Sequence, residues 1–251
     1  MSRADSDGRS QRRSLVIAHR GASGTLPENT LPAYELAVAQ NADMIEIDLH
    51  RSRDGAIVIA HDADLAGLGG RGEIADVALS EVRALDAGGG ERVPTLDEVL
   101  DGFGTRIPFN LEIKRGRRGE YPGLEAAALE AVERRGLLRR TLFSCFHDGV
   151  LDRLRRQSAT ARIGFLLSPR DPARPIERAR AVRAEALHPW VGLAKPDLIE
   201  AAHAEGLAVY PFTVDVEDDM RRLLDLGVDG LFTNYPDRLR ALIDFPVRNS
   251  I

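Results

Sequence analysis

The sequence predicts an α/β protein whose strands and helices form a (β/α)8 TIM barrel. Apolar runs with the length of strands alternate along the chain with amphipathic stretches, the pattern of a parallel sheet with crossover helices. Eight such strands in 251 residues match the size of this barrel. An open doubly wound sheet is the alternative, but no G-x-G-x-x-G turn follows the first strand to support it.

The elements follow one another in a regular order. The predicted strands cover residues 15–19, 44–50, 107–114, 141–146, 161–167, 185–188, 207–214 and 230–234. The amphipathic stretches have the period of a helix and lie between strands, at 30–40, 123–135, 148–157, 196–205, 217–226 and 237–243. Each stretch therefore predicts a helix that crosses between parallel strands.

Residues 51–106 are too many for a simple βα unit and predict an insertion over one mouth of the barrel. The segment opens with the turn Asp54-Gly55, which leads into an extra strand over 56–60. Glycine-rich stretches then separate a short helix, with Ser80 as its N-cap, from another helix around 95–100.

Composition and charge exclude several classes of protein. With 43% hydrophobic and 29% charged residues, the chain is not a fibrous repeat, and we expect residues 15–251 to form a single barrel domain. Residues 1–14 are polar and rich in serine and arginine, so we expect a disordered arm there. The net charge of −5 argues against nucleic acid as a partner.

The sequence does not indicate a membrane or an oxidising compartment. It contains no apolar run of about eighteen residues, so we expect no transmembrane segment. The first residues lack the apolar stretch of a secretory signal. Cys145 is the only cysteine, and one thiol cannot form an internal disulfide. We therefore expect a cytoplasmic protein, and its oligomeric state stays open.

Carboxylates share one face of two predicted strands. The two-residue period of a strand places Glu46 and Asp48 on the same face, between apolar residues that point the other way. The third predicted strand repeats the pattern with Glu112. Buried like charges are costly unless a cation compensates them. The three carboxylates predict a site for one hard divalent cation, Mg²⁺ or Ca²⁺, and zinc fits less well.

Two histidines follow strand-like runs. His19 closes the first predicted strand, at the carboxyl end, where barrels of this class have their active sites. His61 closes the extra strand and precedes Asp62. Because the pKa of histidine lies near neutrality, two such residues can work as an acid and base pair.

Two cations flank the carboxylates in the sequence. Arg20 follows His19 directly, and Lys114 is one of only two lysines among 34 cationic residues. A compact ammonium group retained beside Glu112 suggests a point charge for a phosphate oxygen. The same two cations allow a second interpretation, in which a buried salt-bridge network holds the carboxylates without a metal.

Nine short motifs occur in a recognisable order along nearly the whole chain after Ser14. They are His19-Arg20-Gly21, Pro27-Glu28-Asn29-Thr30, Ile45-Glu46-Ile47-Asp48, Asp54-Gly55, His61-Asp62, Leu85-Asp86-Ala87-Gly88, Pro94-Thr95-Leu96, Leu111-Glu112-Ile113-Lys114 and Gly227-Val228-Asp229-Gly230. In this order they resemble the glycerophosphodiester phosphodiesterase family. The resemblance implies a (β/α)8 barrel with an insertion after the second strand, a divalent metal, and hydrolysis of glycerophosphodiesters to sn-glycerol 3-phosphate and an alcohol.

The resemblance also implies a role for each matching residue. The small-molecule substrate would be a glycerophosphodiester, and the cofactor would be one divalent cation. The implied catalytic residues are His19 and His61, the implied metal ligands are Glu46, Asp48 and Glu112, and the implied phosphate-binding cations are Arg20 and Lys114.

The sequence departs from the family pattern on the seventh predicted strand. The family often has Trp-Thr-Val-Asn there, whereas this chain has Phe212-Thr213-Val214-Asp215. Phe212 keeps an aromatic wall at the substrate mouth, but Asp215 changes a polar contact. We expect His188, at the end of the sixth predicted strand, either to line the same mouth or to cap a turn.

Other functions stay open at this point. A barrel that binds phosphate ligands without catalysis would contain the same residues, with the carboxylates held by salt bridges alone. A related phospholipase D-like activity on lysophospholipids is a further alternative. A barrel glycosidase also uses paired carboxylates, but the histidine pair and the phosphate cations argue against it.

Overall fold

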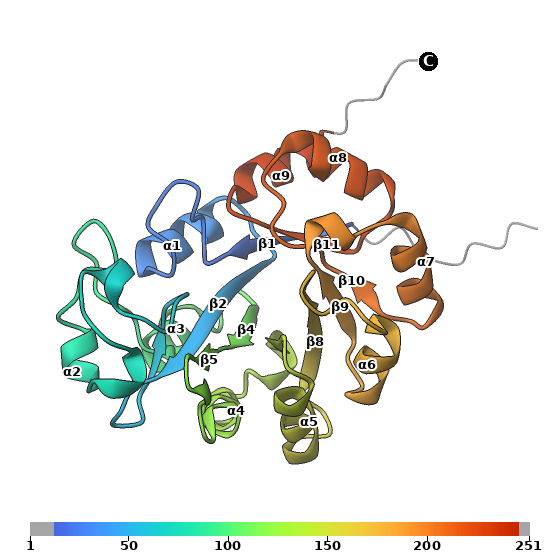
Figure 1. The fold of residues 1–251 in the computed structure, drawn as a ribbon. Helices are drawn as coiled ribbons and strands as arrows, with labels where there is room; N and C mark the ends of the chain where they lie inside the picture. The colour runs from blue at the N-terminus through green and yellow to red at the C-terminus, as the bar shows by residue number, and fades with distance from the viewer. Residues whose placement is uncertain (1–12, 246–251) are drawn as a thin grey trace, which may run out of the picture.

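The computed structural model describes residues 13–245 and shows parallel strands enclosed by helices (Figure 1). The order of neighbouring strands is β10-β9-β8-β7-β4-β2-β1-β11, and every pair along this path is parallel. The predicted TIM barrel is confirmed. The barrel strands are β1 (Leu15–His19), β2 (Met44–Arg51), β4 (Phe109–Ile113), β7 (Thr141–Cys145), β8 (Arg162–Leu167), β9 (Ala186–Pro189), β10 (Ala208–Val209) and β11 (Gly230–Thr233).

Backbone hydrogen bonds bring the ring nearly to closure between β10 and β11. The amide of Asp229 donates to the carbonyl oxygen of Val209 at 3.1 Å, and the amide of Phe232 donates to that of Pro211 at 3.0 Å. β10 is shorter than predicted, although the amides of Tyr210 and Phe212 still donate to β9, at the carbonyl oxygens of Leu187 and Pro189. All eight carboxyl ends meet at one mouth, which is where a barrel of this class places its site.

Helices cover the outer face of the barrel, as Figure 1 shows. Helix α6 was not predicted, because its seven residues, of which three are charged, are too few to show a helical period. The other outer helices agree with the predicted stretches. The helices of this layer are α1 (Leu31–Ala39), α4 (Leu124–Arg134), α5 (Asp148–Gln157), α6 (Pro175–Ala181), α7 (Pro196–Ala204), α8 (Glu217–Asp225) and α9 (Pro236–Asp244).

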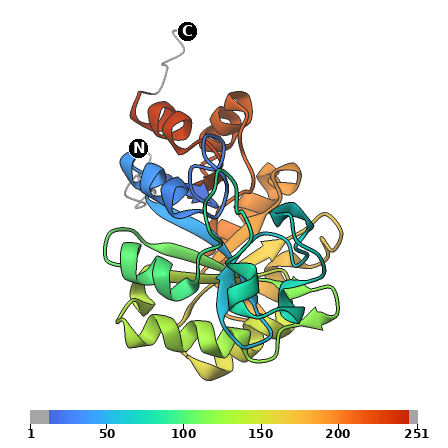
Figure 2. The ribbon, with the colours of Figure 1, turned by 90° about the vertical axis from the view of Figure 1, so that its left-hand side faces the viewer.

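The segment 51–106 forms the predicted extra strand and two α-helices beside β2. β3 (Ile57–Ile59) pairs antiparallel with β2, and the segment lies at one side of the barrel in Figures 1 and 2. Its helices are η1 (Ala66–Leu68), η2 (Ile74–Asp76), α2 (Leu79–Val82) and α3 (Leu96–Phe103). A hairpin of β5 (Arg115–Gly116) and β6 (Gly119–Glu120), which was not predicted, follows β4. That the segment is an insertion stays a prediction.

The two predicted helix starts in this segment have different outcomes. Thr95 caps α3, because its hydroxyl accepts from the amide of Glu98 at 3.2 Å and the Glu98 carboxylate accepts from the amide of Thr95 at 2.9 Å. The predicted N-cap at Ser80 is wrong, since this residue lies inside α2. The carboxylate of Asp54 reaches the first amide of that helix, at Leu79, from the preceding turn at 3.0 Å.

The hydrophobic core has a layer on each side of the strands. Outward residues of the strands pack under the helices in the largest buried cluster, which includes Ile45 and Ile47 of β2. Inward residues fill the barrel below its mouth with a second, smaller cluster of Ile17, Met44, Leu142, Ala186, Tyr210 and Phe232. The barrel interior is therefore packed, and its polar residues lie above this apolar floor.

The described part of the chain begins at Arg13, so residues 1–12 of the predicted arm lie outside it. Arg13 forms an ion pair with Asp244, and the hydroxyl of Ser14 donates to the carbonyl oxygen of Val228 at 2.8 Å. Within residues 13–245, no helix has the length and apolar character needed to cross a membrane.

His188 neither lines the mouth nor caps a turn, the two roles expected from the sequence. Its side chain points inward from β9 and is 0% exposed, with ring centroids 5.4 Å from Tyr210 and 5.0 Å from Phe232. The ring occupies the space beside Gly164, where a Cβ atom would lie 2.3 Å from it. Neither ring nitrogen has a hydrogen-bond partner among the described residues, and burial lowers the pKa of His188 to about 3.

This burial makes His188 a source of acid sensitivity. Below pH 6.5 the unfolded chain binds a proton at this residue, whereas the folded chain stays unprotonated down to about pH 3. Its contribution to stability is complete above pH 6.5 and is lost as the pH falls toward 3. As the pH falls from 6 to 5, we expect the unfolding free energy to decrease less in His188→Gln than in the wild type. The expected difference between the two decreases is about 1 kcal/mol for this one pH unit. Urea titrations at several pH values measure this, and equal slopes would contradict it.

Candidate active site

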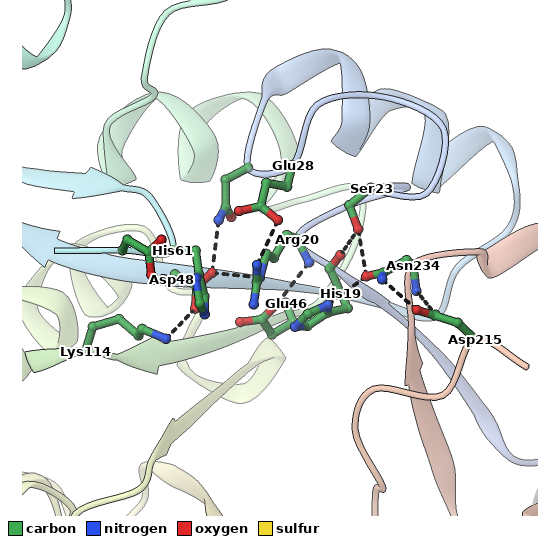
Figure 3. Close-up of polar contacts among 12 residues, drawn as sticks. His19, Arg20, Ser23, Glu28, Glu46, Asp48, His61, Lys114, Asp215 and Asn234 are labelled. Carbon is green, nitrogen blue, oxygen red and sulfur yellow. Dashed lines mark hydrogen bonds and ion pairs between the residues drawn. The ribbon is translucent and has the colours of Figure 1, made fainter. Parts of the chain in front are cut away.

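The carboxyl ends of β1, β2 and β4 bring four predicted site residues together. His19 is paired in register with Glu46, and Asp48 is paired with Glu112 on the next strand. Alternate residues of a barrel strand point inward, so all four side chains share the interior. Figure 3 shows His19, Glu46 and Asp48 close together at this mouth.

The three carboxylates form one compact cluster. Glu46, Asp48 and Glu112 each place a carboxylate oxygen within 4.8 Å of the others. Burial and the charges of Asp48 and Glu112 raise the pKa of Glu46 well above its usual value. Burial also raises the pKa of Glu112, although the Lys114 ammonium opposes this shift. The site therefore holds more negative charge than its surroundings stabilise.

Two cations reach this cluster but leave one oxygen unpaired. Lys114 Nζ lies 3.3 Å from Asp48 Oδ1 and 3.0 Å from Glu112 Oε1, and Arg20 Nε lies 3.3 Å from Asp48 Oδ2. Burial raises the pKa of Asp48, but these cations outweigh burial and lower it overall. Glu46 Oε1 is buried and has no hydrogen-bond partner within residues 13–245. An unpaired oxygen among three carboxylates and two cations fits a hard divalent cation.

Asn29 supports Asp48, a role that the sequence did not reveal. The side-chain amide of Asn29 donates to Asp48 Oδ2 at 2.9 Å, and its oxygen accepts from the hydroxyl of Tyr34 at 3.2 Å. The residue lies in the motif that follows the first strand, which was the only signal for it. Together with the two cations, it fixes the orientation of the carboxylate.

His19 is partly buried at the end of β1, and Asn234 is the polar partner of its ring among the described residues. Its Nδ1 lies 2.7 Å from Oδ1 of Asn234, a residue that follows β11 (Figure 3). Burial and the neighbouring Arg20 guanidinium lower the pKa of His19 to about 4. The ring is therefore neutral at pH 7.

His61 follows β3 and is more exposed than His19. Its Nδ1 lies 3.0 Å from a carboxylate oxygen of Asp62, and a cavity of about 120 Å³ opens beside it. Burial and Lys114 lower its pKa, while Asp48 and Asp62 oppose this shift. The structure thus brings both predicted histidines to the mouth of the barrel, with different partners.

A buried histidine on β2 holds the backbone at His61. His50 Nε2 donates to the carbonyl oxygen of His61 at 3.1 Å, and the hydroxyl of Tyr121 donates to His50 Nδ1 at 2.7 Å. His50 shares the inward face of its strand with the carboxylates, which is a signal that the sequence contained. Its partner Tyr121 lies 71 positions later, so the contact itself could not be predicted.

This fold and site belong to a known family. A family model described as the glycerophosphoryl diester phosphodiesterase family matches residues 19–238. The chain belongs to this family. A glycerophosphodiester phosphodiesterase of Caldanaerobacter subterraneus is 35% identical over 240 residues, which cover 92% of this chain and 98% of the relative. One from Bacillus subtilis is 33% identical over 254 residues, which cover 90% and 85%.

Solved structures of the family have the same fold. A putative glycerophosphoryl diester phosphodiesterase from Silicibacter pomeroyi has a TM-score of 0.86 at 28% identity, over 92% of this chain and 93% of the other. A phosphodiesterase from Oleispira antarctica has a TM-score of 0.78 at 32% identity, over 91% and 96%. That structure is a complex with the product sn-glycerol-3-phosphate.

The segment where this chain departs from the family pattern follows β10. Phe212 is half-buried, and its ring packs edge-to-face on Phe146 with centroids 5.8 Å apart. Its carbonyl oxygen accepts from the amide of Val191 at 2.7 Å, next to Trp190, which is 42% exposed. Phe212 and Phe146 therefore form an aromatic pair after β10, and the role of Phe212 at a substrate mouth stays a prediction.

Proposed function

We propose that this chain hydrolyses glycerophosphodiesters to sn-glycerol 3-phosphate and an alcohol, with one divalent cation held by Glu46, Asp48 and Glu112. The observation that carries the proposal is the unpaired, buried Oε1 of Glu46 within this cluster. Membership of the family and the product complex of its Oleispira relative support the substrate class. The oxygen-only donor set favours Mg²⁺ or Ca²⁺.

A bound divalent cation would supply Lewis-acid polarisation of a phosphoryl oxygen. Arg20 and Lys114 would bind the remaining phosphate oxygens, since both already lie against the carboxylate cluster. In the low-dielectric mouth these fixed charges act strongly on negative charge that develops in the transition state. Lys114 contacts two carboxylates of the cluster, Asp48 and Glu112, whereas the Arg20 guanidinium contacts Asp48 and, outside the cluster, Glu28, so we assign Lys114 the larger effect on turnover.

The two histidines would divide the proton transfers between them. His19 is neutral at pH 7, and its free nitrogen would accept the proton of the attacking hydroxyl, from water or from the glycerol of the substrate. His61 is more exposed and paired with Asp62, so it would donate a proton to the oxygen of the leaving alcohol. Each transfer typically contributes about 10²–10⁴-fold to the rate.

The function is tested by the release of glycerol 3-phosphate from glycerophosphocholine, with and without a chelator. We expect turnover with Mg²⁺ or Ca²⁺ and none in EDTA. Turnover that persists in EDTA would contradict the metal, and no turnover with any divalent cation would favour a barrel that only binds phosphate ligands. Lysophosphatidylcholine, assayed in parallel, tests the phospholipase D-like alternative.

A variant that removes one carboxylate from the cluster should affect stability and metal binding in opposite directions. Glu46→Gln should raise the melting temperature of the metal-free protein, because it relieves repulsion between buried carboxylates. It should also reduce the rise in melting temperature on adding Ca²⁺ or Mg²⁺, since the binding site loses a charged ligand. Calorimetry on this variant and on the exposed control Glu130→Gln measures both effects. If the melting temperature of the wild-type protein does not change on adding Mg²⁺ or Ca²⁺, the result would support the salt-bridge network without a metal.

The leaving group can distinguish the acid from the base. A p-nitrophenolate leaves without protonation, so a p-nitrophenyl glycerophosphodiester should largely restore turnover in His61→Gln. His19→Gln should stay at least about 100-fold slower than wild type on both this substrate and glycerophosphocholine. Steady-state rates of the two variants on the two substrates decide the assignment. If the p-nitrophenyl substrate restores His19→Gln rather than His61→Gln, the two roles are exchanged. If it restores the turnover of neither variant, His61 is not the acid.

A further inference from the structure

We propose that Asp215 is a positioning residue for His19 and acts through the side-chain amide of Asn234. The inference rests on the proposed function in one respect, namely that His19 has a catalytic role. Asp215 is one of two residues at which this chain departs from the Trp-Thr-Val-Asn run of the family, and its carboxylate contacts Thr233 and Asn234. Figure 3 shows the side chains of His19, Asn234 and Asp215 in one line, with Asn234 in the middle.

Asp215 receives hydrogen bonds from the segment that ends β11. Its Oδ1 accepts from the backbone amide of Asn234 at 2.8 Å and from the hydroxyl of Thr233 at 3.1 Å. Its Oδ2 accepts from the side-chain Nδ2 of Asn234 at 2.7 Å. Three donors on neighbouring residues thus meet one carboxylate, which fixes both the backbone and the side chain of Asn234.

These contacts determine which way the amide of Asn234 points. A carboxylate only accepts hydrogen bonds, so the amide nitrogen of Asn234 must face Asp215. The amide oxygen then faces His19, and its distance of 2.7 Å from Nδ1 is that of a hydrogen bond. The hydroxyl of Ser23 lies 2.8 Å from the same oxygen and 2.7 Å from the carbonyl oxygen of His19, and because it has one hydrogen to share between them it does not decide the orientation.

The orientation of the amide in turn fixes the tautomer of His19. An amide oxygen only accepts, so the proton of the neutral ring must sit on Nδ1. The lone pair is then on Nε2, at the other side of the ring from Asn234. With the ring between Asn234 and Glu46, as Figure 3 shows, Nε2 is available at the mouth of the barrel.

An asparagine at position 215, as the family often has, would not make the same three contacts. One of its two polar atoms would be an NH₂ group, which donates. That group would face either the backbone amide of Asn234 or its side-chain Nδ2, and both of these are also donors. In this chain the carboxylate therefore matches the donors around it, and the amide does not.

The tautomer can be measured without reference to activity. In ¹⁵N spectra of the histidine rings, we expect His19 of the wild type to be in the Nδ1–H form, with His19→Gln identifying its signals. In Asp215→Asn we expect a substantial Nε2–H population. A wild-type His19 in the Nε2–H form, or an unchanged tautomer in Asp215→Asn, would overturn the proposal.

Kinetics of an exchange variant test the chain of contacts as a unit. Asp215→Asn should lower kcat at least tenfold with little change in KM, because the substrate contacts are intact. The double exchange Asp215→Asn with Asn234→Asp reverses the side-chain hydrogen bond between the two residues. It keeps an oxygen at position 215 for the Thr233 hydroxyl and the backbone amide, and an oxygen at position 234 for His19, so it should recover kcat to within about threefold of wild type. The tautomer of the exchange variant should again be Nδ1–H.

A matched control separates positioning from stability. Asp229 also accepts from a histidine and a backbone amide, at 2.8 Å each, but at the opposite end of the barrel. Asp229→Asn should keep kcat within about twofold while its melting temperature falls. If Asp215→Asn behaves like this control, or if the exchange variant is no faster than Asp215→Asn, the proposal is wrong. Lack of glycerol 3-phosphate release by the wild type would refute the proposed function and leave the tautomer result standing.

Discussion

Three carboxylates buried at the mouth of a parallel barrel are the constraint on which the rest of the site depends. Burial and the charges of Asp48 and Glu112 raise the pKa of Glu46, and the side chains of the two nearby cations contact Asp48 and Glu112 rather than Glu46. Asn29 and Arg20 fix Asp48 from the loop after β1. The loops around the mouth are thus organised by the need to stabilise negative charge, and one buried oxygen is left for a further positive charge.

β2 combines this charged face with the main source of stability. Its outward residues Ile45 and Ile47 are fully buried under the helices, so burial on one face offsets the cost of charge on the other. At its carboxyl end the same strand pairs with β3, and its His50 holds the carbonyl of His61. The hydrophobic packing, the carboxylate cluster and one of the two histidines therefore all depend on a single strand.

The sequence predicted the residues that strand alternation and strand ends determine. Glu46, Asp48 and Glu112 were found because a period of two places them on one face of neighbouring strands. Hydrogen-bond partners were not found, since they join distant segments: Asn234 lies 215 positions from His19. His188 was misplaced for a related reason. Position at a strand end did not reveal that its ring fills the space beside Gly164.

The two histidines have partners of different charge, and this difference suits different tasks. His61 lies 3.0 Å from the carboxylate of Asp62, whose charge favours the protonated ring and opposes the lowering of the His61 pKa by burial and Lys114. His19 donates to a neutral amide and is more deeply buried, so its neutral form is favoured. Asp215 adds its negative charge behind that amide, where it polarises the hydrogen bond without a direct ion pair. A ring in this setting is neutral before reaction and is still stabilised when it receives a proton, which is what a general base requires.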